Sequence, residues 1–192
     1  MSVTDSPIVA TLSTSPVTPA ERAELVALGV LSADGAVLPA PDHDLRRVAR
    51  TAIQAHTVLN EAYDYPKAAS FTRGVRFDLG DKAMLMISGT ASVDEGGLSA
   101  HLGDFRAQLW RTYRNITALL KAEDATWHDI VRTTCYLRDI ERDYRDFNEI
   151  RTAFFDWLGL HPLPASTGIQ ARLCREDLLI EIEAIAVIPR LR

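Results

Sequence analysis

The chain has 192 residues, with 21 Lys and Arg against 26 Asp and Glu, so its formal net charge at pH 7 is −5. This length predicts one domain of roughly 100–200 residues, with or without a short attachment, and such a chain can bury a core without disulfides. The acidic balance argues against a protein that binds duplex nucleic acid. The two Cys residues are too few for a disulfide framework or for a zinc site of their own.

No targeting or membrane segment is predicted. The first residues lack the basic start and the apolar run of a signal peptide, and no stretch approaches the ~18–20 apolar residues of a membrane helix. The five His residues show no metal-ligand spacing, and no phosphate-binding glycine motif is present. We therefore expect a cytoplasmic protein that has no metal or cofactor, no membrane partner and no nucleic-acid partner.

Two helices are predicted in the first third of the chain. Residues 1–16 are rich in Ser, Thr and Pro and predict an extended or disordered segment. Thr18-Pro19-Ala20-Glu21 is a capping-box signature for a short helix that Gly29 can end. A longer helix is predicted from Asp42 to about Glu61, because apolar residues recur there at helical spacing.

After Pro66 the pattern predicts alternating strands and helices. The predicted strands cover about residues 71–79, 83–90, 130–138, 166–173 and 178–187. Amphipathic helices are predicted from Asp104 to about Lys121 and from about Arg142 to Leu158. This order indicates an α+β fold with two helices on one face of a mixed sheet. We assign residues 66–192 to this domain and residues 1–65 to an N-terminal helical extension.

The last strand divides its residues between two faces. Its apolar face carries Ile180, Ile182, Ala184 and Ala186, whereas Glu181 and Glu183 share the other face with Ile185 and Val187, because side chains alternate along a strand. This second face could be open to solvent. It could also be covered by another subunit, and a partly desolvated carboxylate there could act as an acid or base.

Two further features can carry chemistry. Ser88-Gly89-Thr90 is a small polar break after an apolar strand and can direct hydroxyl and backbone N–H groups toward a ligand. Cys174 lies between Arg172 and Arg175, so it is either a reactive thiol or an ordinary surface thiol. Cys135 alternates with core positions and is expected to be buried.

The chain resembles the Rid superfamily, also called the YjgF/UK114 or "endoribonuclease L-PSP" family. The matching motifs are Ile87–Thr90, Asn115, Asp129–Thr134, Phe147–Asn148, Pro164–Thr167 and Glu181–Ala186. The resemblance implies a chorismate-mutase-like α+β fold, a homotrimer and ligand clefts between subunits. A trimer would cover the sheet face that carries Glu181.

The chain departs from the imine and enamine deaminases of this family at two positions. Those enzymes carry an Arg in a Pro-Ala-Arg-Ser stretch, where it binds the substrate carboxylate in a bidentate pair. That position is Ala165 here, and the family's Tyr near the first strand corresponds to Phe71. The acidic residue that positions water is present as Glu181. The resemblance therefore implies a divergent member that lacks the deaminase Arg.

A second resemblance is to chorismatases, which are Rid-related enzymes that hydrolyse or rearrange chorismate. Pro164–Ile169 is similar to their version of this stretch. Some of them also place a Cys shortly before the final strand and use a Glu on that strand as an acid. This similarity implies Glu181 and Cys174 as catalytic candidates.

The resemblance thus implies an enzyme of hydrolase, deaminase or lyase type that binds a small carboxylated metabolite, imine/enamine or chorismate-like, in a cleft between subunits. Arg73, Arg132 or Arg175 could supply the missing cation. The alternative hypothesis is a trimer that binds a small molecule without catalysis and has lost the deaminase Arg. The candidate substrate-binding residues are Phe71, Arg73, Ser88, Gly89, Thr90, Arg132, Tyr136, Ala165, Ser166, Thr167, Gly168 and Arg175.

Overall fold

The computed structural model describes residues 17–39, 48–65 and 68–190. The chain forms two units, Met1–Arg47 and Val48–Arg192. The predictions for residues 1–16 and for the helix start at 42–47 lie outside the described residues. None of the helices within the described ranges is long and apolar enough to span a bilayer.

The first unit contains helix α2 (Pro19–Ala27), as the capping signature predicts. The backbone N–H of Glu21 donates to the Thr18 hydroxyl at 3.2 Å, and the Thr18 N–H donates to the Glu21 carboxylate at 2.7 Å. Gly29 follows the helix with a φ of 73°, a conformation that glycine adopts without strain. No residue of α2 is buried.

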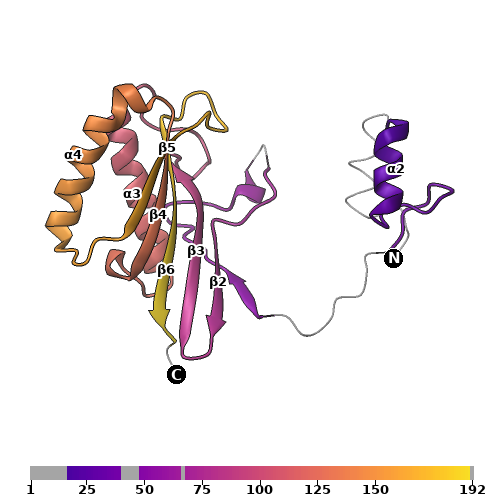
Figure 1. The fold of residues 1–192 in the computed structure, drawn as a ribbon, viewed down its shortest axis with the longest axis horizontal. Coiled ribbons are helices and arrows are strands. Elements are labelled where there is room, and N and C mark those ends of the chain that lie inside the picture. The colour runs from indigo at the N-terminus through magenta and orange to yellow at the C-terminus, as the bar shows by residue number, and fades with distance from the viewer. Residues whose placement is uncertain (1–16, 40–47, 66–67, 191–192) are drawn as a thin grey trace. The chain divides into compact units, whose positions relative to one another are not determined.

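The second unit is built on a six-stranded sheet of order β1-β2-β3-β6-β4-β5 (Figure 1). The strands are β1 (Arg50–Ala52), β2 (Gly74–Leu79), β3 (Lys82–Ala91), β4 (Ile130–Leu137), β5 (Ala165–Gln170) and β6 (Ile180–Pro189). Strands β4 and β5 are parallel, and all other neighbours are antiparallel. The parallel pair needs a crossover, which helix α4 (Ile140–Leu158) provides.

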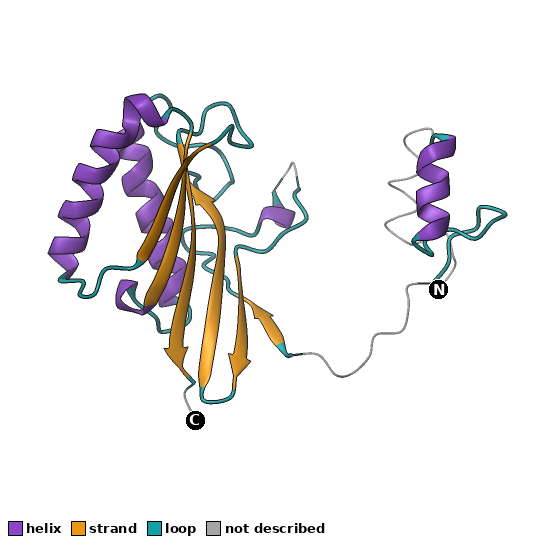
Figure 2. Cartoon of the chain, viewed as in Figure 1, coloured by secondary structure: helices purple, strands orange, loops and turns teal. Residues whose placement is uncertain are grey.

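Helices α3 (Phe105–Lys121) and α4 cover one face of the sheet (Figures 1 and 2). The Asp104 side chain caps α3 by accepting from the Ala107 N–H. Gly159 ends α4 in the left-handed conformation. Two 3-10 turns, Ala62–Asp64 and Trp127–Asp129, complete the unit. The predicted α+β fold with two helices on one face is confirmed.

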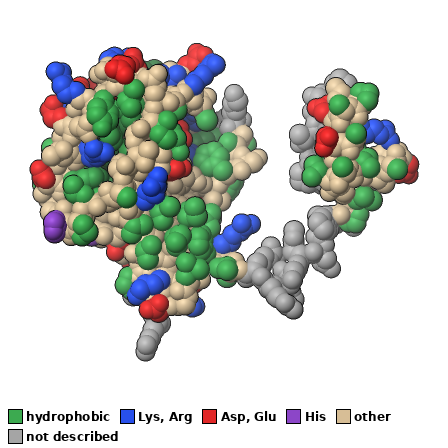
Figure 3. Space-filling model, viewed as in Figure 1, with side chains coloured by type: hydrophobic (Ala, Val, Ile, Leu, Met, Phe, Trp, Pro, Cys, Tyr) green, Lys and Arg blue, Asp and Glu red, His purple; other side chains and the backbone are tan. Residues whose placement is uncertain are grey.

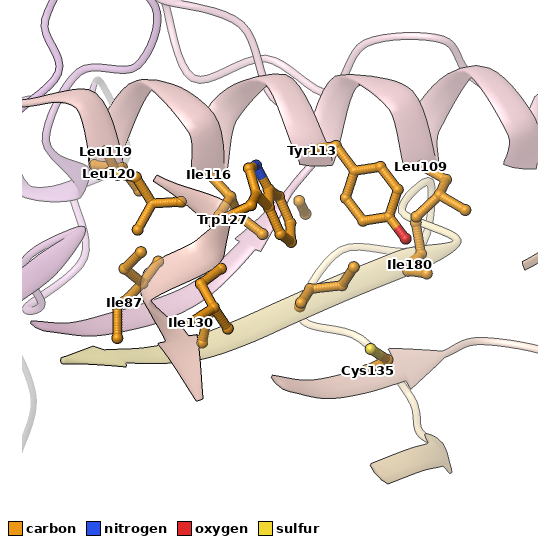
Figure 4. Close-up of a cluster of buried hydrophobic side chains, with 14 of the residues drawn as sticks. Ile87, Leu109, Tyr113, Ile116, Leu119, Leu120, Trp127, Ile130, Cys135 and Ile180 are labelled. Carbon is orange, nitrogen blue, oxygen red and sulfur yellow. The ribbon is translucent and has the colours of Figure 1, made fainter. Parts of the chain in front are cut away.

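The core lies between this helix pair and the sheet. Figure 4 shows Leu109 of α3 beside Ile180 of β6, and Ile116 of α3 pointing toward the strands, and all three are fully buried. Burying each such side chain contributes roughly 1.5–3 kcal/mol. The alternation predicted for β6 is confirmed, because its even-numbered residues are buried whereas Glu181 and Glu183 are partly exposed. Cys135 is buried, as expected.

The predicted helix from Asp42 to Glu61 is wrong over the described residues 48–61. Arg50 to Ala52 form β1, which pairs with β2, and the Ile53 N–H donates to the Gly74 carbonyl at 2.8 Å. Ile53 and Leu59 are fully buried in the core. The apolar spacing of Val48, Ala49, Ala52 and Ile53 fits a helix, but pairing with the sheet edge overrides local propensity here. The second unit therefore begins at Val48, before the expected boundary at residue 66.

Candidate functional site

A β-bulge interrupts β3 at Ser88-Gly89. Ile87 pairs with Ala184 and Thr90 pairs with Ile182, so β3 uses three steps where β6 uses two. The extra residue kinks the strand, and bulges are frequent beside active sites. The predicted polar break is thus a bulge on the face away from the helices.

Hydroxyl groups hold this bulge in place. The Ser88 hydroxyl donates to the Thr72 carbonyl at 2.7 Å, and the Thr90 hydroxyl donates to the Ser88 carbonyl at 2.9 Å. Thr90 is buried, so this residue supports the bulge and does not line an open pocket as the sequence suggested. Ser88 and Gly89 are only partly buried and remain able to meet a ligand.

The Glu181 carboxylate packs directly against the Gly89 backbone. A Cβ atom built on Gly89 would lie 2.0 Å from Glu181 Oε1. Any side chain at position 89 would therefore displace this carboxylate. The Glu181 carboxylate can therefore occupy this position only because residue 89 has no side chain.

Burial raises the pKa of Glu181, the charge of Glu183 raises it further, and Arg73 partly opposes both. A carboxyl group with a raised pKa can exchange a proton nearer to neutral pH than an ordinary Glu can. Glu183 has a different role, since its carboxylate accepts a 3.0 Å hydrogen bond from the Tyr136 hydroxyl. Partial burial raises the pKa of Tyr136, and this bond raises it further.

Arg73 lies in the same region and is 5% exposed. Its Nε donates to the Asn60 carbonyl at 3.0 Å, and its Nη2 donates to the Tyr65 hydroxyl at 2.5 Å. The guanidinium carbon lies 5.0 Å from the centre of the Tyr65 ring and 5.4 Å from that of Phe71.

Five predicted residues therefore come together at one place, which we call the Glu181 corner: Phe71, Arg73, Ser88, Gly89 and Glu181. Asn60 and Tyr65 also build this corner, and sequence reasoning missed them. Both precede residue 66 and were assigned to the helical extension.

A second group of predicted residues lies on strands β4 and β5. We call it the β4–β5 edge: Arg132, Ala165 and Thr167. Arg132 pairs with Ala165 on β5 and with Ile185 on β6, and its Nη2 donates to the Thr167 hydroxyl at 3.2 Å. Ala165 is therefore level with Ile185, which is four residues from Glu181 on β6, and it lies two strands away from β6. At the usual strand dimensions, Ala165 is separated from Glu181 by about 13 Å along the strands and about 10 Å across them. One chain does not bring the edge and the corner together.

Ser166 and Gly168 face the helix layer. The Ser166 hydroxyl accepts from Thr133 at 3.1 Å and from Arg151 of α4 at 3.2 Å. A Cβ atom on Gly168 would approach Tyr144 of α4 at 3.8 Å. Ser166 and Gly168 therefore lie on the opposite side of β5 from Ala165 and Thr167.

Arg175 and Cys174 occupy the loop before β6. Arg175 Nη1 donates to the Gly97 carbonyl at 2.5 Å, and Gly97 lies against the Tyr65 ring. Arg175 thus stabilises the loop at Gly97 that packs against the Tyr65 ring. Cys174 is a free, exposed thiol, and within the described residues no hydrogen bond joins it to Glu181.

Two hollows flank the β4–β5 edge. One of about 100 Å³ lies on the open face and is lined by residues that include Met86, Arg132 and Glu183 but not Glu181. The other, of about 180 Å³, lies between α4 and the start of β5, beside Arg151 and Ser166. No cluster of three or more potential metal ligands occurs among the residues that the structure describes.

Residues 64–188 match the family described as "Endoribonuclease L-PSP". The chain belongs to this family. A 2-iminobutanoate/2-iminopropanoate deaminase of Salmonella typhimurium is 33% identical over 117 residues, which cover 61% of this chain and 86% of the relative. A RutC family protein of Pyrococcus abyssi is 30% identical over 102 residues, covering 53% of this chain and 76% of the relative.

Solved structures have the same fold. The YjgF gene product of E. coli superposes with a TM-score of 0.57 at 30% identity, over 71% of this chain and 98% of that one. E. coli TdcF, solved with bound serine, gives 0.59 at 27% identity, over 72% and 98%. Membership of the Rid/YjgF superfamily and the α+β fold expected from the resemblance are thereby confirmed.

Proposed function

We propose that the chain is an enzyme that hydrolyses a small carboxylated metabolite, with Glu181 as its acid and base. The observation that carries this proposal is the Glu181 carboxyl group, held against Gly89 and raised in pKa by burial. The imine deaminase at 33% identity supports an imine or enamine substrate. A chorismate-like substrate is the other choice within this class.

For an imine substrate the reaction is the addition of water across C=N. Ionised Glu181 takes a proton from water as the water oxygen bonds to the imine carbon. The same carboxyl group then returns a proton to nitrogen. In the same way the carboxyl group moves the proton of the new hydroxyl to the amino nitrogen, so the C–N bond breaks as the carbonyl forms, and ammonia leaves. A group with a raised pKa suits both proton transfers.

We further propose that the site is completed in a homotrimer. The sheet face away from the helices carries apolar side chains, among them Met84, Met86, Ile185 and Val187, which are exposed or only partly buried. Figure 3 shows hydrophobic side chains gathered over the lower part of these strands. Packing against another copy would remove this surface from water and could bring a β4–β5 edge to a neighbour's Glu181 corner.

The test is release of ammonia from freshly generated 2-iminobutanoate and, separately, conversion of chorismate. We expect turnover of one of them, and Glu181→Gln to lower kcat by about 10²–10⁴-fold. Glu183→Gln is the matched control, because it removes a neighbouring carboxylate that does not contact Gly89. Turnover that is equal in wild type and Glu181→Gln would refute the proposal.

One observation favours a second function, a trimer that binds a small molecule without reaction. Ala165 provides no guanidinium at the position where the family's deaminases carry one. Ligand binding that persists in Glu181→Gln, with no reaction of either substrate in wild type, would support the binding function instead.

A further inference from the structure

Arg73 is a buried cation whose hydrogen-bond partners are neutral. Buried charges are normally paired with an opposite charge. The guanidinium donates instead to a backbone carbonyl and to a phenol hydroxyl. Glu61 is nearby, but its carboxylate accepts from the Arg73 backbone N–H. Across residues 17–39, 48–65 and 68–190, no carboxylate is in ion-pair distance of the guanidinium.

One end of this guanidinium is left for a ligand. The group has five N–H donors, and Nε and Nη2 are engaged by Asn60 and Tyr65. Within the described ranges Nη1 has no hydrogen-bond partner. The rings of Tyr65 and Phe71 lie near the guanidinium. The fixed group therefore offers Nη1, with the second hydrogen of Nη2, to a planar anion.

This donor lies close to the proposed acid and base. The Arg73 carbonyl accepts from the Ser88 N–H at 3.0 Å, and the next residue, Gly89, contacts the Glu181 carboxylate. Arg73 also influences the pKa of Glu181. A carboxylate on Arg73 would thus place the adjacent carbon atoms of a short molecule beside Glu181.

We infer that Arg73 receives the substrate carboxylate and so replaces the arginine that Ala165 does not supply. The inference rests on the proposed function and narrows its substrates to small molecules with a carboxylate adjacent to the reacting carbon, such as short 2-imino acids. The other two candidate cations fit less well. Arg132 is exposed, where water and salt weaken its attraction for an anion, and Arg175 is bound to the loop at Gly97.

The experiment compares two probes that differ by a carboxylate. 2-Oxobutanoate is the stable ketone counterpart of the imine, and butanone lacks its carboxylate. Binding of each to the full chain is followed by NMR titration. We expect Arg73→Gln to weaken 2-oxobutanoate binding by about tenfold or more, while butanone binding changes little. Arg145→Gln, which removes an exposed arginine of α4, is the matched control and should leave both unchanged, and Arg73→Lys should restore part of the preference for the anion.

Selectivity between the two probes separates binding from folding, since a purely structural Arg73 would alter both equally. If Arg73→Gln does not fold, the structure of wild type with 2-oxobutanoate decides, because its carboxylate must contact the Arg73 guanidinium. A carboxylate found on Arg132, unchanged selectivity in Arg73→Gln, or no binding to wild type at millimolar concentration would overturn the inference. If imine hydrolysis still depends on Glu181 in those cases, the proposed function stands. Arg73-dependent binding without Glu181-dependent turnover would refute only the proposed function.

Discussion

The Glu181 corner and the β4–β5 edge lie on the same open face of one sheet, yet they are built differently. In the corner, the Arg73 guanidinium is buried, held by two hydrogen bonds and flanked by aromatic rings. In the edge, Arg132 is exposed and donates to a single threonine hydroxyl. Opposite Arg132 stands Ala165, whose methyl side chain carries no charge.

This difference shows where a charge on this face can act most strongly. An electrostatic interaction gains strength as water is removed from around it, and exposed charges are screened by salt. The corner already removes water from Arg73 and from part of Glu181, whereas the edge does so for neither Arg132 nor Ala165. A chain built in this way can lack an arginine on β5 and still hold a fixed cation near its acidic group.

The largest expected effect concerns the segment before residue 66, which contributes residues to the corner but none to the edge. Deleting residues 1–65 removes Ile53 and Leu59 from the core and Asn60 and Tyr65 from Arg73. Loss of each large buried side chain costs about 2–5 kcal/mol, against a total stability of about 5–15 kcal/mol. We expect this truncated chain to be unfolded by circular dichroism and urea titration.

Deleting residues 1–47 is the matched control, since it removes no residue of the second unit. This shorter truncation should unfold cooperatively in urea. If the chain that begins at residue 66 folds, the prediction is wrong, because the corner would then form without the segment before residue 66.

The second expected effect is on turnover, and it compares a substitution of Gly89 in the corner with one of Gly168 on β5. Gly89→Ala places a methyl group where the Glu181 carboxylate lies. The flexible end of Glu181 can move aside, so the fold should survive with a similar thermal midpoint. Turnover should fall by about 10²-fold or more, as expected when a general acid or base is displaced.

Gly168→Ala is the control for this experiment. Its new Cβ would meet only Tyr144, at an ordinary contact distance of 3.8 Å, and it lies on the helix side of β5. We expect its kcat to stay close to wild type. Equal losses in the two variants would show that any methyl group added to the sheet disturbs turnover, and that the contact between Gly89 and Glu181 is not special.

Much of the fold could be predicted from local sequence patterns. The capping box at Thr18, the period of α3 and the alternation along β6 each follow from rules that act within a few residues. The segment before Pro66 could not be predicted in this way. Its apolar spacing suits a helix, and only the edge of β2, far along the chain, makes residues 50–52 a strand.

The site shows the same division between local and distant information. Alternation could place Glu181 and Glu183 on the face away from the core, and the family resemblance singled out Glu181 between them. The partners of Arg73 could not, since Asn60 and Tyr65 reach it through a folded loop that has no periodic signal. The separation of Ala165 from Glu181 was also hidden. Strand order, with β6 between β3 and β4, determines that distance, and sequence order does not reveal it.

The smallest expected effect is a pH dependence of stability that arises in the corner. The pKa of Glu181 is raised from its ordinary 4.5 in the folded state, first by burial and then by the charge of Glu183. The folded state therefore keeps this proton to a higher pH than the unfolded state does. The contribution of Glu181 to the unfolding free energy is full below the ordinary pKa and is lost as pH rises through the raised one.

Urea unfolding at pH values from about 4 to 8 measures this contribution directly. Glu181→Gln cannot titrate, so its unfolding free energy relative to wild type should increase as pH rises through this window and then become constant. Glu183→Gln removes the second cause of the shift, so the pKa of Glu181 should move back toward 4.5 and the pH window should narrow. Arg132→Gln, on the edge, should leave the window in place. A relative stability of Glu181→Gln that does not vary with pH would mean that the corner does not desolvate its carboxyl group, and the contrast with the exposed edge would then fail for Glu181.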